Sequence, residues 1–114
     1  EKVIFVITTD GQENASQEYS HKMVKKMIEK HQEKGWQFLF LGANIDAAEE
    51  AEKIGIRRSH AASYKNDAKG VKLNYEAAGS IMACMRSADY DEEDVELMIP
   101  QFLRPIKAHL EDED

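Results

Sequence analysis

The residues best suited to chemistry follow the first apolar run of the sequence. Thr8, Thr9, Asp10 and Gly11 come directly after it. A carboxylate oxygen is a ligand that hard divalent cations prefer, and sites in parallel α/β sheets lie at the carboxyl ends of strands. We therefore interpret Asp10 as a candidate metal ligand and the two threonines as candidates for a supporting role around it. An Asp-Gly pair is also a frequent turn pair on any fold, so this interpretation depends on the surrounding elements.

A second polar loop follows the second apolar run, residues 36–41, and contains Asn44 and Asp46. Both are candidates for a position around the same ion. Asp46 has an alternative role, because Glu49 three residues later completes a capping-box pattern for a helix over residues 47–54. Gly55 would end that helix.

The elements that must position these residues alternate along the chain. The first run has no period-2 alternation, which predicts a strand covered on both faces, and it consists of Val3, Ile4, Phe5, Val6 and Ile7. Residues 36–41 predict a second buried strand, and the small and polar residues 59–63 predict a third strand at an edge.

Helical spacing joins the strands. Over residues 20–34 one face would carry Met23, Met27 and Ile28, with Val24 and His31 beside it. Ser20 or Asn14 could cap this helix, and Gly35 would end it. Residues 64–72 read as a polar loop, followed by a third helix whose apolar positions are Leu73, Ala77, Ala78, Ile81, Met82 and Met85.

Beyond Ser87 the chain turns acidic but keeps an apolar stripe from Val95 to Leu110. Pro100 and Pro105 interrupt the stripe, which predicts one or two short helices. These helices would cover the chain's own core or, alternatively, dock on a partner. We therefore expect half of a doubly wound parallel α/β sheet over residues 1–87 and an acidic helical tail over residues 88–114.

The strand ending in Ile7-Thr8-Thr9-Asp10-Gly11 resembles the third metal-site segment of von Willebrand factor A-type domains. The similarity, which is to bacterial members, continues through residues 38–46 and 53–56 and covers roughly residues 2–87. It implies the carboxyl-terminal half of a non-enzymatic protein-interaction domain that holds Mg²⁺ or Mn²⁺ in its complete form. Most ligands in the family come from an Asp-x-Ser-x-Ser loop, which this sequence lacks, so Asp10 would be a partial site that binds no metal tightly alone.

Other chemistries find little support in the residue pattern. The four histidines show no i, i+4 pair, and the single cysteine, Cys84, lies in an apolar helical stretch. No Gly-x-Ser-x-Gly elbow and no glycine-rich phosphate loop occur. The alternatives are a small Rossmann-like or flavodoxin-like domain that binds a phosphorylated ligand at the same loops, or an assembly fragment without a working site.

Charge and apolar edges set the expectations about partners. The formal charge of −7, from 22 acidic and 15 basic residues, argues against nucleic acid and anionic membranes as partners. The apolar runs are far shorter than the roughly 20 residues of a membrane span and no signal peptide is evident, which suggests a cytoplasmic location. The first strand would lack a neighbour on one side, so we expect a homo-oligomer through that edge or through the tail helices, with any other protein partner unknown.

Overall fold

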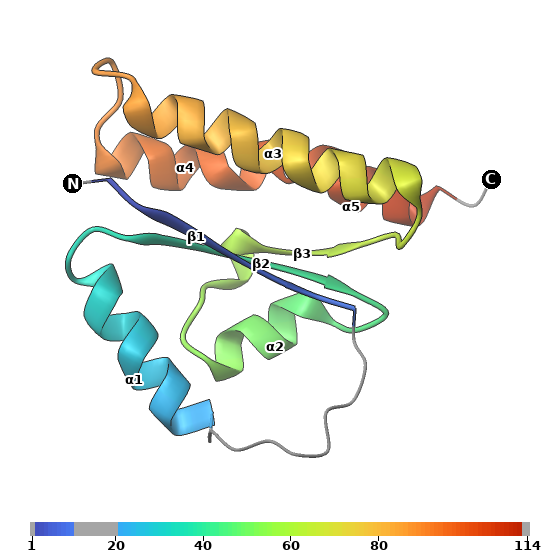
Figure 1. Cartoon of the computed structure of the whole chain (residues 1–114), viewed down its shortest axis with the longest axis horizontal. Coiled ribbons are helices and arrows are strands. Elements are labelled where there is room, and N and C mark those ends of the chain that lie inside the picture. The colour runs from blue at the N-terminus through green and yellow to red at the C-terminus, as the bar shows by residue number, and fades with distance from the viewer. Residues whose placement is uncertain (1, 11–20, 113–114) are drawn as a thin grey trace.

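The computed structural model describes residues 2–10 and 21–112, and these form a three-stranded parallel sheet with helices on both faces (Figure 1). The strand order is β1-β2-β3, so β2 is central. The predicted α/β fold with a helical tail is confirmed. In chain order the elements are β1 (Ile4–Thr9), α1 (His21–Gln32), β2 (Gln37–Ala43), α2 (Ala47–Lys53), a 3-10 turn η1 (Arg58–His60), β3 (Ala61–Tyr64), α3 (Ala68–Arg86), α4 (Glu92–Phe102) and α5 (Arg104–Glu111).

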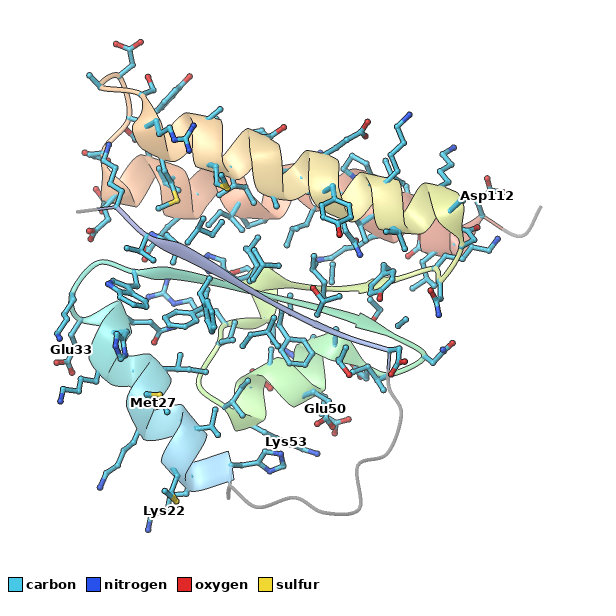
Figure 2. The ribbon with its side chains drawn as sticks, in the orientation of Figure 1. Lys22, Met27, Glu33, Glu50, Lys53 and Asp112 are labelled. Carbon is cyan, nitrogen blue, oxygen red and sulfur yellow. The ribbon has the colours of Figure 1, made fainter. Side chains whose placement is uncertain are left out.

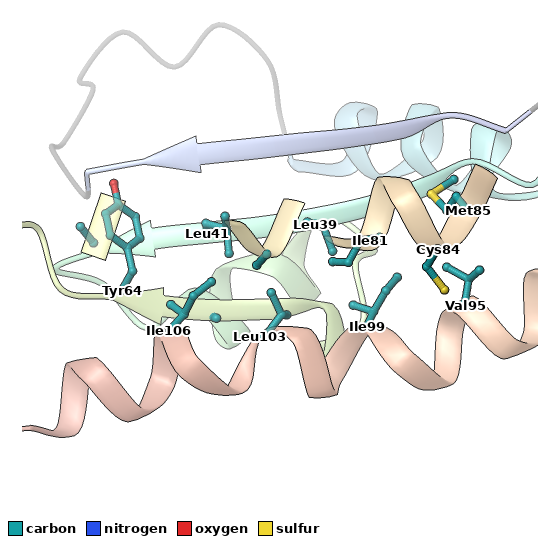
Figure 3. Packing of buried hydrophobic residues seen from close by; sticks show 13 residues of the cluster. Leu39, Leu41, Tyr64, Ile81, Cys84, Met85, Val95, Ile99, Leu103 and Ile106 are labelled. Atoms are coloured by element: carbon teal, nitrogen blue, oxygen red, sulfur yellow. The ribbon is translucent and has the colours of Figure 1, made fainter. Parts of the chain in front are cut away.

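The helices form two layers. Figure 1 shows α1 and α2 on one face of the sheet and α3, α4 and α5 on the other. Every residue of β2 is buried between these layers, which explains its uninterrupted apolar run. The larger core cluster joins Leu39 and Leu41 of β2 to Ile81, Ile99 and Ile106 of the three tail-side helices (Figure 3).

The strand β1 departs from its predicted environment. It was expected to be covered on both faces, but Phe5 is 53% exposed and Thr8 is exposed. The reason is that β1 lies at a sheet edge and pairs only with β2 among the described strands, while α1 and α2 pack over β2. The same edge position was expected from its missing neighbour.

The face of α1 also differs from the predicted one. Ile28 is buried and Val24 is half-buried in the smaller core cluster, but Met23 and Met27 are 59% and 58% exposed. The residues of α2 and β2 that face α1 cover only part of the predicted apolar face, so the two methionines stay largely in solvent. The helix ends at Gln32, and Gly35, the expected stop, lies in the turn that follows, with a backbone φ of +91° that suits glycine. The two candidate caps, Ser20 and Asn14, lie outside the described residues.

The third helix begins earlier than predicted. The sequence pattern placed residues 64–72 in a loop, whereas α3 starts at Ala68 because the Asp67 side chain caps it, accepting a hydrogen bond from the Gly70 N–H at 2.7 Å. Gly70 lies directly against the Lys65 carbonyl oxygen, where a Cβ would collide. The polar residues of this segment are therefore helix-starting residues.

The acidic tail folds into α4 and α5, which cover the chain's own core, as the first of the two alternatives predicted. Asp91 and Asp94 form a reciprocal capping box at the start of α4. Pro105 stands in the first turn of α5, where a missing N–H costs nothing. Pro100 lies inside α4 and leaves the Glu96 carbonyl without its helical donor.

Candidate functional site

The two predicted site loops lie together at the carboxyl ends of β1 and β2. Thr8 pairs with Leu41 and Thr9 with Gly42 across the parallel ladder, so Asp10 and Asn44, which follow these strands, lie at the same end of the sheet. The Asn44 side-chain amide donates a long hydrogen bond, 3.5 Å, to the Asp10 backbone carbonyl. The structure thus brings Asp10 and Asn44 side by side, and Asp10 is exposed to solvent.

The loop that carries Asn44 is held by a residue that the sequence reasoning missed. Ser63 of β3 accepts a hydrogen bond from the Ala47 N–H at 3.0 Å and donates one to the Ile45 carbonyl at 2.9 Å. Asn44 itself adopts a left-handed backbone with φ of +62°, a conformation that asparagine tolerates better than most residues. The Ser63 hydroxyl therefore bonds both the first N–H of α2 and a carbonyl of the loop before it. These two bonds hold the loop that carries Asn44 against β3.

Asp46 acts as a helix cap. Its carboxylate accepts a hydrogen bond from the Glu49 N–H at 3.2 Å and stands at the start of α2. This confirms the capping role of Asp46, and one of its oxygens is already engaged there.

The two threonines point to opposite faces of the sheet. Side chains alternate along β1, where Val6 packs toward the α3–α5 layer and Ile7 toward α1 and α2. Thr8 lies two residues beyond Val6, on the same face, and is exposed. Thr9 lies two residues beyond Ile7, on the opposite face, and is half-buried. Only one of them can lie on the same face as a ligand bound at the strand end.

The oxygen atoms at this end match the chemistry of a hard cation but are few. Asp10 supplies a carboxylate and Asn44 an amide, while Asp46 is shared with the helix cap. Within residues 2–10 and 21–112, no group of three or more His, Cys, Asp or Glu side chains could hold a metal ion. The donor set fits Mg²⁺ or Mn²⁺ in kind, and it is too small to replace most of the ion's water.

A second polar region lies at the other end of the sheet, around His60, which is only 5% exposed. A cavity of about 140 Å³ borders it and is also lined by Gln37, Arg57 and Glu96. Burial lowers the pKa of His60 below its ordinary value, while the nearby Glu96 carboxylate acts to raise it and Arg57 to lower it. The sequence reasoning treated His60 as a surface or packing residue and did not detect this environment.

His60 also lies close to α4, because η1 contacts that helix. The backbone at Glu96 and at Phe38 of β2 also acts to raise the pKa of His60, against the larger effect of burial. The Glu96 carbonyl is the acceptor that Pro100, lacking an N–H, cannot use. His60 therefore lies where η1 meets α4.

A third polar contact fixes the tail at the site end of the sheet. The His109 ring of α5 lies 3.0 Å from the carboxylate of Asp67, the residue that caps α3. Asp112, which follows α5, is labelled near this end of the helix in Figure 2. The Gly70 N–H and then His109 hold the pKa of Asp67 below its usual value. This contact connects two helices and uses a carboxylate that stands close to the exit of β3.

None of the helices in residues 21–112 is long and apolar enough to cross a membrane. Comparison of the chain with protein-family models, with curated proteins and with solved structures finds no match.

Proposed function

We propose that the chain is a non-enzymatic protein-interaction module of the von Willebrand factor A type, in which Asp10 contributes one ligand to a divalent metal ion. The observation that carries the proposal is the position of Asp10 at the carboxyl end of a parallel strand, next to Asn44 from the neighbouring strand. The remaining ligands would come from an Asp-x-Ser-x-Ser loop supplied by another segment. A metal ion held in this way leaves a coordination position open for a partner carboxylate.

The charges at this end of the sheet favour a cation over the alternative phosphorylated ligand. A phosphate in an α/β fold needs the exposed N–H groups of a helix start. Aspartate carboxylates already occupy two of these starts, Asp46 at α2 and Asp67 at α3. A bound phosphate would have to displace or face these negative charges, whereas a cation would gain from them.

Metal binding by this chain alone should be weak. Mg²⁺ and Mn²⁺ require several well-placed oxygens before they release water, and Asp10 with Asn44 offers too few. We expect a dissociation constant weaker than about 0.1 mM for either ion.

Paramagnetic line broadening tests the location even when binding is weak. Titration of the ¹⁵N-labelled chain with Mn²⁺ should broaden the backbone amides of Thr9, Asp10 and Asn44 first. The Asp10→Asn variant should lose this local effect at the same Mn²⁺ concentration. Asp89→Asn removes an equally exposed carboxylate from the turn before α4 and should leave the broadening at Asn44 unchanged.

Two results would contradict the proposal in different ways. Broadening that is confined to the acidic start of α4 and is unchanged in Asp10→Asn would remove Asp10 from any metal site. Calorimetry that gives micromolar affinity, lost in Asp10→Ala, would show that the chain's own metal site is complete.

A further inference from the structure

The outer edge of β1 carries none of the features that usually block strand pairing. Its six residues, Ile4–Thr9, include no proline and no charged side chain. Natural edge strands are commonly protected by lysine, proline, a bulge or short length. Among the described strands β1 pairs with β2 alone, so its other edge faces no strand of the described residues.

Exposed apolar side chains also lie on α1, which covers one face of the sheet (Figure 1). Lys25 and Glu29 lie against Gly55, beyond the end of α2, so that side of α1 faces inward along the sheet toward α2. Met23 and Met27 lie on a different side of the helix and are more than half exposed. Figure 2 shows Met27 on the side of α1 that is turned to the viewer, where β1 also lies in front of β2.

Phe5 is a further exposed apolar side chain, on the face of the sheet that α1 and α2 cover. It is 53% exposed and makes an edge-to-face contact with Phe38, with ring centroids 5.7 Å apart. Phe5, Met23 and Met27 are thus exposed apolar side chains on one side of the sheet, and exposed apolar side chains that gather on one side indicate an interaction surface.

The sequence of β1 is complementary to itself in one antiparallel register. In a two-fold pair the opposed residues must share a face, so a residue pairs with one of the same odd or even number. Centring the pair on Val6 places Ile4 opposite Thr8 and Lys2 opposite Asp10 of the other copy. Lys2 and Asp10 are both exposed, and they carry opposite charges.

The neighbouring registers lack this match. Centring on Phe5 would place Lys2 opposite Thr8, and centring on Ile7 would place Ile4 opposite Asp10. Only the register centred on Val6 pairs opposite charges at both ends of an otherwise apolar seam.

We propose that two copies of this chain associate through antiparallel pairing of their β1 strands in the register centred on Val6. The two sheets then become continuous, Phe5 of each copy lies beside Ile7 of the other, and Met23 and Met27 flank the seam on the α1 face. The association uses backbone hydrogen bonds and apolar contacts and needs no metal ion, so it is measured in the presence of a chelator.

Sedimentation equilibrium of the 114-residue chain tests the surface. The chain should be dimeric at protein concentrations near 0.1 mM, about the range in which a small specific interface is populated. Phe5→Lys places a charge at the seam of both copies and should give a monomer under the same conditions. Leu97→Lys makes the same change at a 70% exposed apolar residue on α4 and should leave the dimer intact.

A charge exchange tests the register. Lys2→Glu or Asp10→Lys alone turns two attractive contacts of the dimer into repulsive ones and should weaken association by about fivefold to tenfold at low salt. The double variant Lys2→Glu/Asp10→Lys restores opposite charges and should regain the original affinity. Circular dichroism of each variant checks that the fold is kept, since both side chains are exposed.

Three outcomes would overturn the proposal. One is a chain that stays monomeric at about 0.1 mM protein. Another is a dimer that Leu97→Lys disrupts and Phe5→Lys does not. The third is a double charge variant that is no better than its two single variants, which would refute the register centred on Val6.

Discussion

The two edge strands of the sheet differ in how far other elements of the chain cover them. β3 is four residues long, three of its residues are buried, and α2, η1 and α5 all contact it. β1 is six residues long, and Phe5 within it is half exposed. Elements of the chain itself therefore cover β3, whereas β1 pairs only with β2 among the described strands.

The two edges also differ in how much they contribute to stability. Ile106 of α5 is 1% exposed and belongs to the large cluster that covers β3. Residues at the β1 edge bury much less apolar surface and therefore contribute less to folding. Shortening a buried side chain near β3 should therefore destabilise the fold more than shortening an exposed side chain of β1.

The largest expected effect is on the free energy of unfolding, when a side chain is shortened near β3 or on β1. Ile106→Ala should lower the free energy of unfolding by about 2–5 kcal/mol, because a cavity forms in a buried cluster. Phe5→Ala should cost less than half as much in the monomer, since half of its ring is already in solvent. Urea denaturation at a protein concentration where the chain is monomeric measures both.

Equal losses for the two variants would show that β1 is as firmly packed as β3. Leu97→Ala, at an exposed position of α4, serves as the control and should change the free energy of unfolding by less than about 0.5 kcal/mol.

The sequence predicted the order of the elements because the responsible signals are local. Gly35 and Gly55, both with positive φ, lie in the turns that follow α1 and α2, and apolar runs mark the strands. It could not predict which apolar run would be covered. The runs of β1 and β2 look alike, and their burial depends on which strand the helices lie over, a tertiary property that no short window contains.

The segment that joins β3 to α3 allows a second test of how firmly the β3 edge is held. Gly70 stands against the Lys65 carbonyl, so Gly70→Ala forces backbone to move and should destabilise the chain by about 1–3 kcal/mol. Gly79→Ala lies in the same helix, where a Cβ would meet nothing within 4 Å. It should stabilise the chain by about 0.5–1 kcal/mol, because alanine loses less backbone entropy than glycine.

Thermal or urea unfolding of the two glycine variants should therefore shift in opposite directions. If Gly70→Ala behaved like Gly79→Ala, the link from β3 to α3 would be flexible, and the β3 edge would be less rigid than the structure indicates.

The candidate site was predicted in part. Asp10 and Asn44 were identified because polar residues after two apolar runs must meet at one end of a parallel sheet, and they do. Ser63 was missed, because its two hydrogen bonds join residues 16 and 18 positions away. The environment of His60 was missed for the same reason, since its contacts at Phe38 and Glu96 come from distant elements.

The smallest expected effect is a pH dependence of the free energy of unfolding, which comes from His60 at the end of η1. Burial lowers the pKa of His60 from its ordinary value of 6.5, so the unfolded chain binds more protons than the folded chain between the two values. The stabilising contribution is complete above pH 6.5 and is lost as the pH falls through that value toward the folded pKa. His60→Gln should flatten the dependence of the unfolding free energy on pH in this range.

Neighbouring charges can move the pKa of His60 in either direction. Arg57 lowers this pKa and Glu96 raises it, so Arg57→Gln should raise it and Glu96→Gln should lower it. Titration of the His60 ring signals by NMR measures both shifts. Both variants also lose the 3.4 Å ion pair between Arg57 and Glu96, so a shift in the same direction in both would mean that this pair, and not the separate charges, controls the histidine. In that case the β3 edge would be held by a coupled network that joins η1 to α4.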